Sequence, residues 1–245
     1  MNHSQSVCLV LLCCALIASC ALKASNRTAE PPQSNQQTKS EGAILKDIPE
    51  TIDANARWLF YLHGRIIEDQ GKLRPVSPQY GVYEYEEILN AFKRENFIVV
   101  SEARPKDTDV KQYAQKVVGQ IKRLLGAGVK PQQITVVGAS KGASIAMQIS
   151  TDLKNRNVSF VFMGAHPAHC DDLVLKDSAF DFHGRVLTIY EASDDSQTCQ
   201  EFFDKSSGLS KKKEIELKTG LKHGFLYRPL KEWVGPAIDW AKNEK

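Results

Sequence analysis

The stretch that most constrains the fold of this chain is residues 134–149, ITVVGASKGASIAMQI. It begins with a β-branched run typical of a buried strand and ends in a small, apolar run typical of a helix. Between them lies Gly138-Ala139-Ser140-Lys141-Gly142, a Gly-x-Ser-x-Gly motif in the strand, turn and helix context that this motif requires. The pattern predicts that Ser140 lies at the carboxyl edge of a sheet, above a helix N-terminus that stabilises negative charge.

The motif has a second interpretation, in which the glycines form an ordinary turn of an α/β protein and the serine only caps the following helix. The two interpretations differ in the backbone of Ser140. A nucleophile's turn strains that residue, and it requires positions without side chains two residues before and two residues after it, where Gly138 and Gly142 stand.

Strand and helix patterns alternate along the rest of the chain. Strands are expected at residues 58–62, 97–100, 134–137, 158–163, 186–190 and 214–217, and helices at 83–94, 109–125 and, broken, 229–241. This alternation predicts an α/β domain with a mostly parallel sheet of about six strands and helices on both faces. A hydrophobic content of 42% is enough for one sizeable core, and we assign the domain to residues 42–245.

The first 41 residues have a different composition. Residues 1–20 hold an apolar run at 7–18 that is too short to span a bilayer and predicts an export signal. Leu16-Ile17-Ala18-Ser19-Cys20 resembles the bacterial lipobox, in which the cysteine is lipidated, although residues 1–6 lack Lys and Arg. The resemblance implies a lipid anchor at Cys20 on the periplasmic side of a bacterial envelope; cleavage nearby, giving a soluble periplasmic or secreted protein, is the alternative. Residues 21–41 are polar and predict a disordered tether.

The net charge and the number of cysteines indicate which binding partners and which cellular compartment to expect. A net charge of +3 indicates no nucleic-acid partner. Of six cysteines, only Cys170 and Cys199 lie in the predicted domain, and an even pair in an oxidising compartment predicts a disulfide. Two buried thiols are the alternative.

One histidine-rich segment could be mistaken for a metal site. His166-Pro167-Ala168-His169-Cys170 has two histidines and a cysteine, but Pro167 interrupts the spacing and no second ligand cluster follows. We therefore predict no metal. The same segment follows the strand at 158–163, where Cys170 could reach Cys199 in the loop region after the next strand and hold the two loops together.

A serine nucleophile needs a general base, and the base needs an acidic residue that orients it. The chain offers both in the order Ser, acid, His. The strand at 186–190 is followed by Glu191-Ala192-Ser193-Asp194-Asp195, and the strand at 214–217 is followed by His223. We expect Asp194 to be the acid, with Asp195 and then Glu191 as alternatives.

The serine turn, the strand that ends in His63-Gly64, the acidic loop and the late His223-Gly224 together resemble the α/β-hydrolase superfamily over residues 57–243. The resemblance implies a three-layer α/β-hydrolase fold and an oxyanion hole made by the backbone N–H groups of Lys141 and Arg65. It also implies that His63 shapes the oxyanion loop rather than acting as a base.

The resemblance implies a serine hydrolase that cleaves an ester or related acyl bond of a small molecule through an acyl-enzyme, without metal or organic cofactor. A non-catalytic binding protein of the same fold is the alternative, as is an acyltransferase or peptidase that uses the same residues. Substrate identity and oligomeric state have no recognisable signature in the sequence.

Overall fold

A computed structural model describes residues 41–164, 181–195 and 198–243. The chain divides into two compact units, residues 1–37 and 38–245, and the first unit lies outside the described residues. Everything below concerns the second unit. None of its described helices is both long and apolar enough to cross a membrane.

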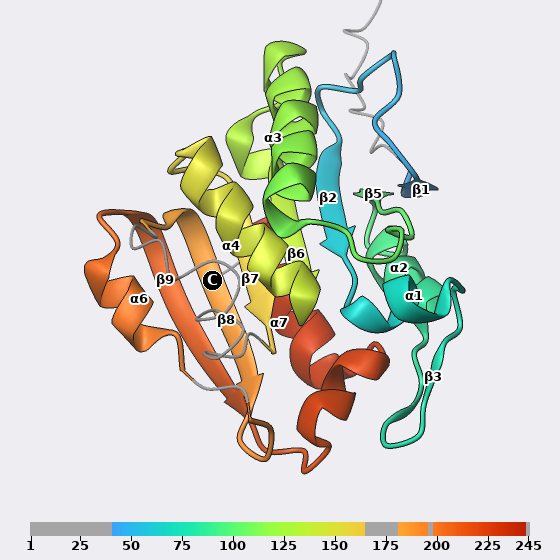
Figure 1. The fold of residues 1–245 in the computed structure, drawn as a ribbon. Coiled ribbons are helices and arrows are strands. Elements are labelled where there is room, and N and C mark those ends of the chain that lie inside the picture. The colour runs from blue at the N-terminus through green and yellow to red at the C-terminus, as the bar shows by residue number, and fades with distance from the viewer. Residues whose placement is uncertain (1–40, 165–180, 196–197, 244–245) are drawn as a thin grey trace, which may run out of the picture. The chain divides into compact units, whose positions relative to one another are not determined.

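The second unit is built on a seven-stranded sheet in the order β1-β5-β2-β6-β7-β8-β9, and every neighbouring pair is parallel (Figure 1). The strands are β1 (Ala43–Leu45), β2 (Arg57–Leu62), β5 (Phe97–Val100), β6 (Ile134–Ala139), β7 (Ser159–Met163), β8 (His183–Glu191) and β9 (Gly208–Leu217). A separate small hairpin pairs β3 (Val76–Ser77) with β4 (Gly81–Val82). The residues that follow the parallel strands therefore gather at one edge of the sheet.

Helices lie between the strands. They are α1 (Arg65–Gln70), α2 (Tyr85–Lys93), α3 (Val110–Gly126), α4 (Lys141–Leu153), α6 (Gln200–Lys205) and α7 (Lys231–Lys242), with 3₁₀ turns η1 (Pro131–Gln133) and η3 (Lys222–Tyr227). Figure 1 shows α3 and α4 packed side by side over the sheet. Asp109 caps α3 by accepting a hydrogen bond from the Gln112 N–H at 2.8 Å, which explains why the helix starts there.

The two faces of the sheet form two hydrophobic cores. Alternate strand residues such as Phe60, Val136 and Phe162 pack against α3 and α4, whereas Tyr61, Val137 and their counterparts pack against α2 and α7. This alternation follows from the period of two along a strand. The three-layer α/β arrangement expected from the sequence is thus confirmed.

The structure corrects three details of the sequence interpretation. The sheet has a seventh strand, β1, which pairs with β5 at the edge and is too short to stand out as a pattern. The strand expected at 186–190 begins earlier, at His183, and ends at Glu191. Helix α7 runs unbroken through Pro236, its sixth residue, so the ring removes only one backbone hydrogen bond within the helix.

Candidate active site

Ser140 occupies the turn between β6 and α4 and has φ 53° and ψ −122°, a conformation that L-residues rarely adopt. The flanking glycines are required by contact. A Cβ on Gly138 would lie 2.3 Å from the Gly142 carbonyl oxygen, and one on Gly142 would lie 1.9 Å from the Leu62 carbonyl oxygen. No hydrogen bond from the Ser140 side chain caps α4. The geometry is that of a strained turn presenting a hydroxyl and differs from that of a helix cap.

The predicted base and acid lie together. The Nδ1–H of His223, in η3, donates a hydrogen bond of 2.7 Å to Oδ2 of Asp194, in the turn after β8. The Asp194 side chain is 8% exposed and the His223 side chain 26% exposed. This hydrogen bond leaves Nε2 of His223 as the basic nitrogen.

Ser140 and His223 line one cavity of about 160 Å³, together with Gly64, Tyr83 and other residues. Within the described ranges, no hydrogen bond joins the Ser140 hydroxyl to the imidazole. Catalytic hydrogen bonds of this kind are often long before substrate binds. The structure therefore brings the predicted serine, histidine and aspartate to one site at the carboxyl edge of the sheet.

The two alternative acids are placed differently. Asp195 is exposed. Glu191, the last residue of β8, is fully buried, and its carboxylate accepts five hydrogen bonds, from the N–H and hydroxyl of Ser193, the N–H and hydroxyl of Thr219, and the Gly220 N–H. Burial alone would raise the pKa of Glu191, but the hydrogen bonds from Thr219 and Ser193 lower it below its ordinary value. Glu191 thus ties together the loops that carry Asp194 and His223.

Arg65 and Lys141 are the first residues of α1 and α4, so neither backbone N–H has a carbonyl one turn earlier in its own helix. Their preceding strands, β2 and β6, are neighbours in the sheet. Gly64 brings the first helix close to the serine, since a Cβ there would lie 3.6 Å from the Ser140 Cβ. The two helix N-termini therefore converge beside Ser140, an arrangement that suits an anionic oxygen.

A buried ionic network, which no sequence pattern predicted, links α1 and α4. Glu68 of α1 accepts from Nζ of Lys141 at 2.5 Å and from Nε of Arg104 at 2.7 Å. The Glu68 and Arg104 side chains are 1% and 0% exposed. Glu68 and Arg104 lie 36 residues apart, with no shared motif, so no local pattern could have paired them.

The same network holds His63. Its Nε2 accepts from the Arg104 backbone N–H at 2.9 Å, so its Nδ1–H donates to the Gly64 carbonyl at 2.8 Å, and Arg104 Nη2 donates to the His63 carbonyl. Burial, reinforced by the Arg104 charge, lowers the pKa of His63 to about 3. His63 is therefore a neutral residue that fixes the turn before α1.

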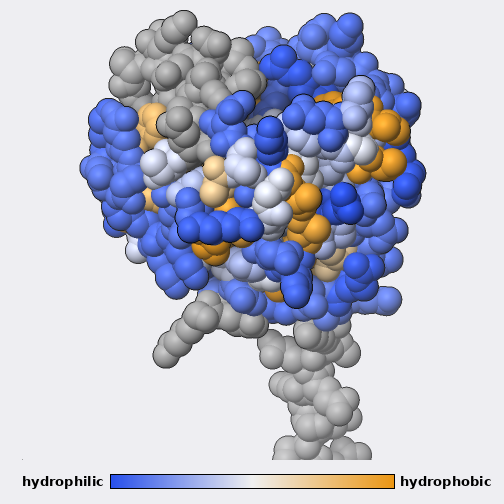
Figure 2. Space-filling view, turned by 90° about the horizontal axis from the view of Figure 1, so that it is seen from below, coloured by the Kyte–Doolittle hydropathy of each residue, from blue (hydrophilic) through white to orange (hydrophobic). Residues whose placement is uncertain are grey.

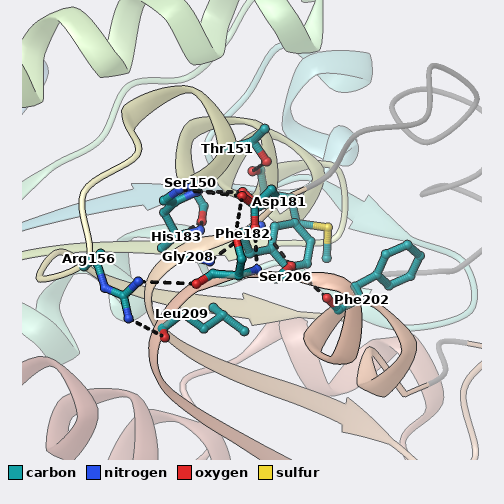
Figure 3. Close-up of polar contacts among 12 residues, drawn as sticks. Ser150, Thr151, Arg156, Asp181, Phe182, His183, Phe202, Ser206, Gly208 and Leu209 are labelled. Carbon is teal, nitrogen blue, oxygen red and sulfur yellow. Dashed lines mark hydrogen bonds and ion pairs between the residues drawn. The ribbon is translucent and has the colours of Figure 1, made fainter.

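A second grouping of Ser, His and Asp lies at the opposite, amino edge of the sheet (Figure 3). There the Ser150 hydroxyl donates to the His183 carbonyl at 2.7 Å and accepts from the His183 N–H at 3.0 Å, so it bonds to backbone and not to the imidazole. The His183 Nδ1–H donates to the Asp181 carbonyl at 2.8 Å. This grouping joins α4 to β8 and lacks the geometry of a nucleophile and base.

Three sequence predictions fall outside the described residues: lipidation of Cys20, the position of Cys170, and the histidines at 166 and 169. Cys199, the predicted disulfide partner, is buried at the N-terminus of α6. Among the described side chains, no group of three or more His, Cys, Asp or Glu residues is arranged to hold a metal ion.

The parallel sheet, the covering helices and the strained serine turn after a central strand define the fold as that of the α/β hydrolases. The comparisons with solved structures agree. An esterase from Pyrococcus furiosus superposes with a TM-score of 0.54 at 15% identity, covering 79% of this chain and 85% of that one. A lipase-esterase related protein from Clostridium acetobutylicum gives 0.52 at 13% identity, covering 77% and 96%.

A protein of unknown function from Agrobacterium tumefaciens, provisionally described as an α/β hydrolase, gives a TM-score of 0.51 at 17% identity over 79% of this chain and 87% of that one. No protein-family model and no curated protein sequence matches the chain. At these identities, the likeness establishes the fold.

Proposed function

We propose that this protein is a serine hydrolase that cleaves an ester or related acyl bond of a small molecule. The observation that carries the proposal is the strained Ser140 sharing a cavity with a His223 imidazole that is hydrogen-bonded to Asp194. A turn of this strain persists only where the surrounding structure enforces it, and such strain is typical of active sites. The esterase names of two structural neighbours support the same reaction class.

In the proposed mechanism, His223 takes the proton of the Ser140 hydroxyl while Oγ bonds to the acyl carbon. The Lys141 and Arg65 N–H groups hold the oxyanion, and each such donor is typically worth about 3 kcal/mol in the transition state. His223 then protonates the departing alcohol as the ester C–O bond breaks. A water, deprotonated by His223, releases the acid and restores Ser140.

The test is labelling with a fluorophosphonate, which bonds only to activated serines. The sample is the protein starting after Cys20, compared with Ser140→Ala, His223→Ala and Ser150→Ala. Wild type and Ser150→Ala should label, because the Ser150 hydroxyl bonds to the His183 backbone at the opposite edge of the sheet, and the other two should not. A folded wild type that stays unlabelled would contradict the proposal and favour a binding role for this fold.

We further propose that the protein is exported to a bacterial cell envelope and anchored through a lipid on Cys20, with residues 21–41 as the tether. The support is the sequence pattern around Leu16–Cys20 and the polar composition that follows it. Expression of the full chain in a bacterium, followed by membrane flotation, should find it with membranes, and Cys20→Ser should release it. Equal flotation of both forms would contradict a lipid anchor at this residue.

A further inference from the structure

Two cavities share Arg65 in their walls, and they differ in size and chemistry. The smaller one, about 160 Å³, contains Ser140 and His223. The larger one, about 480 Å³, is lined by Lys141, the residue after the serine. Arg65 lines both. Because Lys141 adjoins Ser140 in the chain and Arg65 lines both cavities, a substrate that extends from Ser140 past Arg65 would meet two different environments.

The smaller cavity is suited to a short acyl group. Besides the reacting residues, its walls include Ile66, Leu226 and Tyr227, which offer mainly apolar surface. Its volume is about a third of that of the larger cavity, so it suits the smaller part of a substrate. A short acyl group fits within these walls, whereas a long chain would extend out of the cavity or require the walls to move.

The larger cavity is suited to a polar group. Its lining outside the buried Glu68 and Lys141 pair includes Asp69, Asp107, Thr108 and Lys111, and most of these side chains are exposed. Carboxylates accept hydrogen bonds and the cations donate them, while the Thr108 hydroxyl, which donates to the Pro105 carbonyl at 2.7 Å, can still accept one. Both signs of charge are present, so the lining does not select a strongly charged ligand.

A ligand that satisfies such a surface must itself donate and accept at several points, and closely spaced hydroxyl groups do so. The hydrophobicity of this side of the molecule points the same way. Figure 2 views the molecule from the side toward which the strands run, and the hydrophobic residues visible there form separate small groups among hydrophilic ones. Among the residues coloured in this view, no broad apolar surface of the kind that long acyl chains or lipid would require is visible.

We propose that the substrate of the Ser140 site is a short-chain ester of a hydroxyl-rich alcohol, such as an acetylated sugar or polyol. The inference rests on the proposed serine-hydrolase function. The acyl group enters the smaller cavity and the alcohol occupies the larger one. Ser140 bonds to the acyl carbon, the alcohol leaves with the proton carried by His223, and one water is consumed as the short acid is released.

The experiment compares two matched pairs of esters on the protein starting after Cys20. The first pair, p-nitrophenyl acetate and p-nitrophenyl decanoate, differs only in the acyl chain. The second pair, 6-O-acetylglucose and cyclohexyl acetate, shares the acyl group and a six-membered ring but differs in hydroxyl groups. We expect kcat/KM to favour the acetate in the first pair and the sugar in the second, each by about tenfold or more.

Single substitutions in each cavity test whether that cavity is responsible for the expected substrate preference. Leu226→Ala enlarges the smaller cavity and should raise decanoate cleavage relative to acetate cleavage. Thr108→Val, which keeps the side-chain shape and removes the hydroxyl, should reduce the ratio of acetylglucose to cyclohexyl acetate cleavage several-fold. Asp204→Asn, on the exposed side of α6, should leave both ratios unchanged.

The outcomes separate this inference from the proposed function. If a fluorophosphonate labels Ser140 but decanoate or cyclohexyl acetate reacts as fast as its partner, or if no acetate reacts, the substrate class is wrong and the hydrolase proposal remains. If wild type is neither labelled nor active on any ester, the function itself is wrong. Ratios that Thr108→Val and Leu226→Ala leave unchanged would also contradict the assignment of the two cavities.

Discussion

At the scale of single residues, the choice among three neighbouring carboxylates decides how His223 is oriented. Asp194 accepts the Nδ1–H of His223 at 2.7 Å, Asp195 is exposed, and Glu191 is occupied by backbone and hydroxyl donors. Sequence spacing ranked these three residues but could not decide among them, because all lie within residues 191–195, where the strand ends. The hydrogen bonds of the folded chain make the distinction.

Replacing Asp194 by Asn should reduce kcat on a small ester by about 10⁴-fold, because the amide no longer favours the tautomer in which Nε2 is basic. Asp195→Asn is the matched control, with the same chemical change one residue away at an exposed position, and it should change kcat less than about threefold. Steady-state kinetics on both variants provides the measurement. Equal losses would show that Asp194 is not the orienting acid.

Protonation of Glu191 should lower the free energy of unfolding in acid. Its folded pKa lies below its ordinary value of 4.5, so its stabilisation is complete above about pH 4.5 and is lost as pH falls through the folded pKa. Glu191→Gln should lower the free energy of unfolding at pH 7 by about 2–3 kcal/mol, since the amide leaves donors such as the Thr219 N–H unpaired. It should also flatten the decline in stability below pH 4.5.

Urea unfolding at pH 7 and at several lower pH values measures both effects. Glu201→Gln is the control, because its side chain is 73% exposed on α6 and forms an exposed ion pair with Lys205. If Glu191→Gln loses stability with pH as steeply as wild type does, another carboxylate is responsible.

At the scale of secondary-structure elements, the packing of α4 against β2 requires glycine at position 142, because a side chain there would collide with β2. A Cβ on Gly142 would lie 1.9 Å from the Leu62 carbonyl oxygen, and a backbone atom cannot move aside cheaply. Gly142→Ala should therefore destabilise the fold by about 3 kcal/mol or more. Gly119→Ala, in the exposed middle of α3 with open space around it, should instead stabilise the fold by about 0.5–1 kcal/mol.

Thermal unfolding of the two glycine variants tests this contrast. The chemical change is identical, so helix propensity alone would move both melting temperatures upward. A Gly142→Ala protein that melts at or above the wild-type temperature would show that α4 does not approach β2 as closely as described.

Substitutions at different residues of the ionic network should destabilise the protein by different amounts. Glu68 pairs with two cations, so Glu68→Ala leaves Lys141 and Arg104 buried without their carboxylate and should cost about 3–5 kcal/mol. Lys141→Met leaves Glu68 paired with Arg104 and should cost less. It also preserves the Lys141 backbone N–H, so fluorophosphonate labelling should persist.

A double-mutant cycle on Glu68 and Lys141, read by urea unfolding, gives the interaction energy between them. Equal losses for the two single variants, or an interaction energy near zero, would contradict the network as the link between the helices.

At the scale of the whole molecule, a disulfide between Cys170 and Cys199 is the remaining covalent prediction. Cys170 lies outside the described residues, and the prediction rests on the cysteine count and the proposed export. The protein starting after Cys20 holds only these two cysteines. Alkylated under denaturing conditions without reductant, it should keep its intact mass, and prior reduction should add two adducts. Two adducts without reductant would rule out the bridge.

The sequence by itself determined the layered α/β fold and the candidate nucleophile. Residues 134–149 combine a β-branched run, two obligatory glycines and a helix. Because this pattern lies within one short stretch of the chain, it can be recognised without knowing which residues contact it in the folded protein. The strand at 97–100 and the helix at 109–125 were predicted for the same reason. The edge strand β1 was missed because three residues carry too little pattern, and pairing with β5 fixes them.

Only the tertiary structure decided which groups meet. The pairing of Glu68 with Arg104, the role of Glu191 as a tie between two loops, and the two unlike cavities beside Ser140 depend on residues far apart in the chain. Such contacts follow from the order and register of the strands, which a single sequence does not encode in any local pattern. Hydrogen-bond partners and cavity walls are therefore properties of the folded sheet, whereas the serine turn is a property of five consecutive residues.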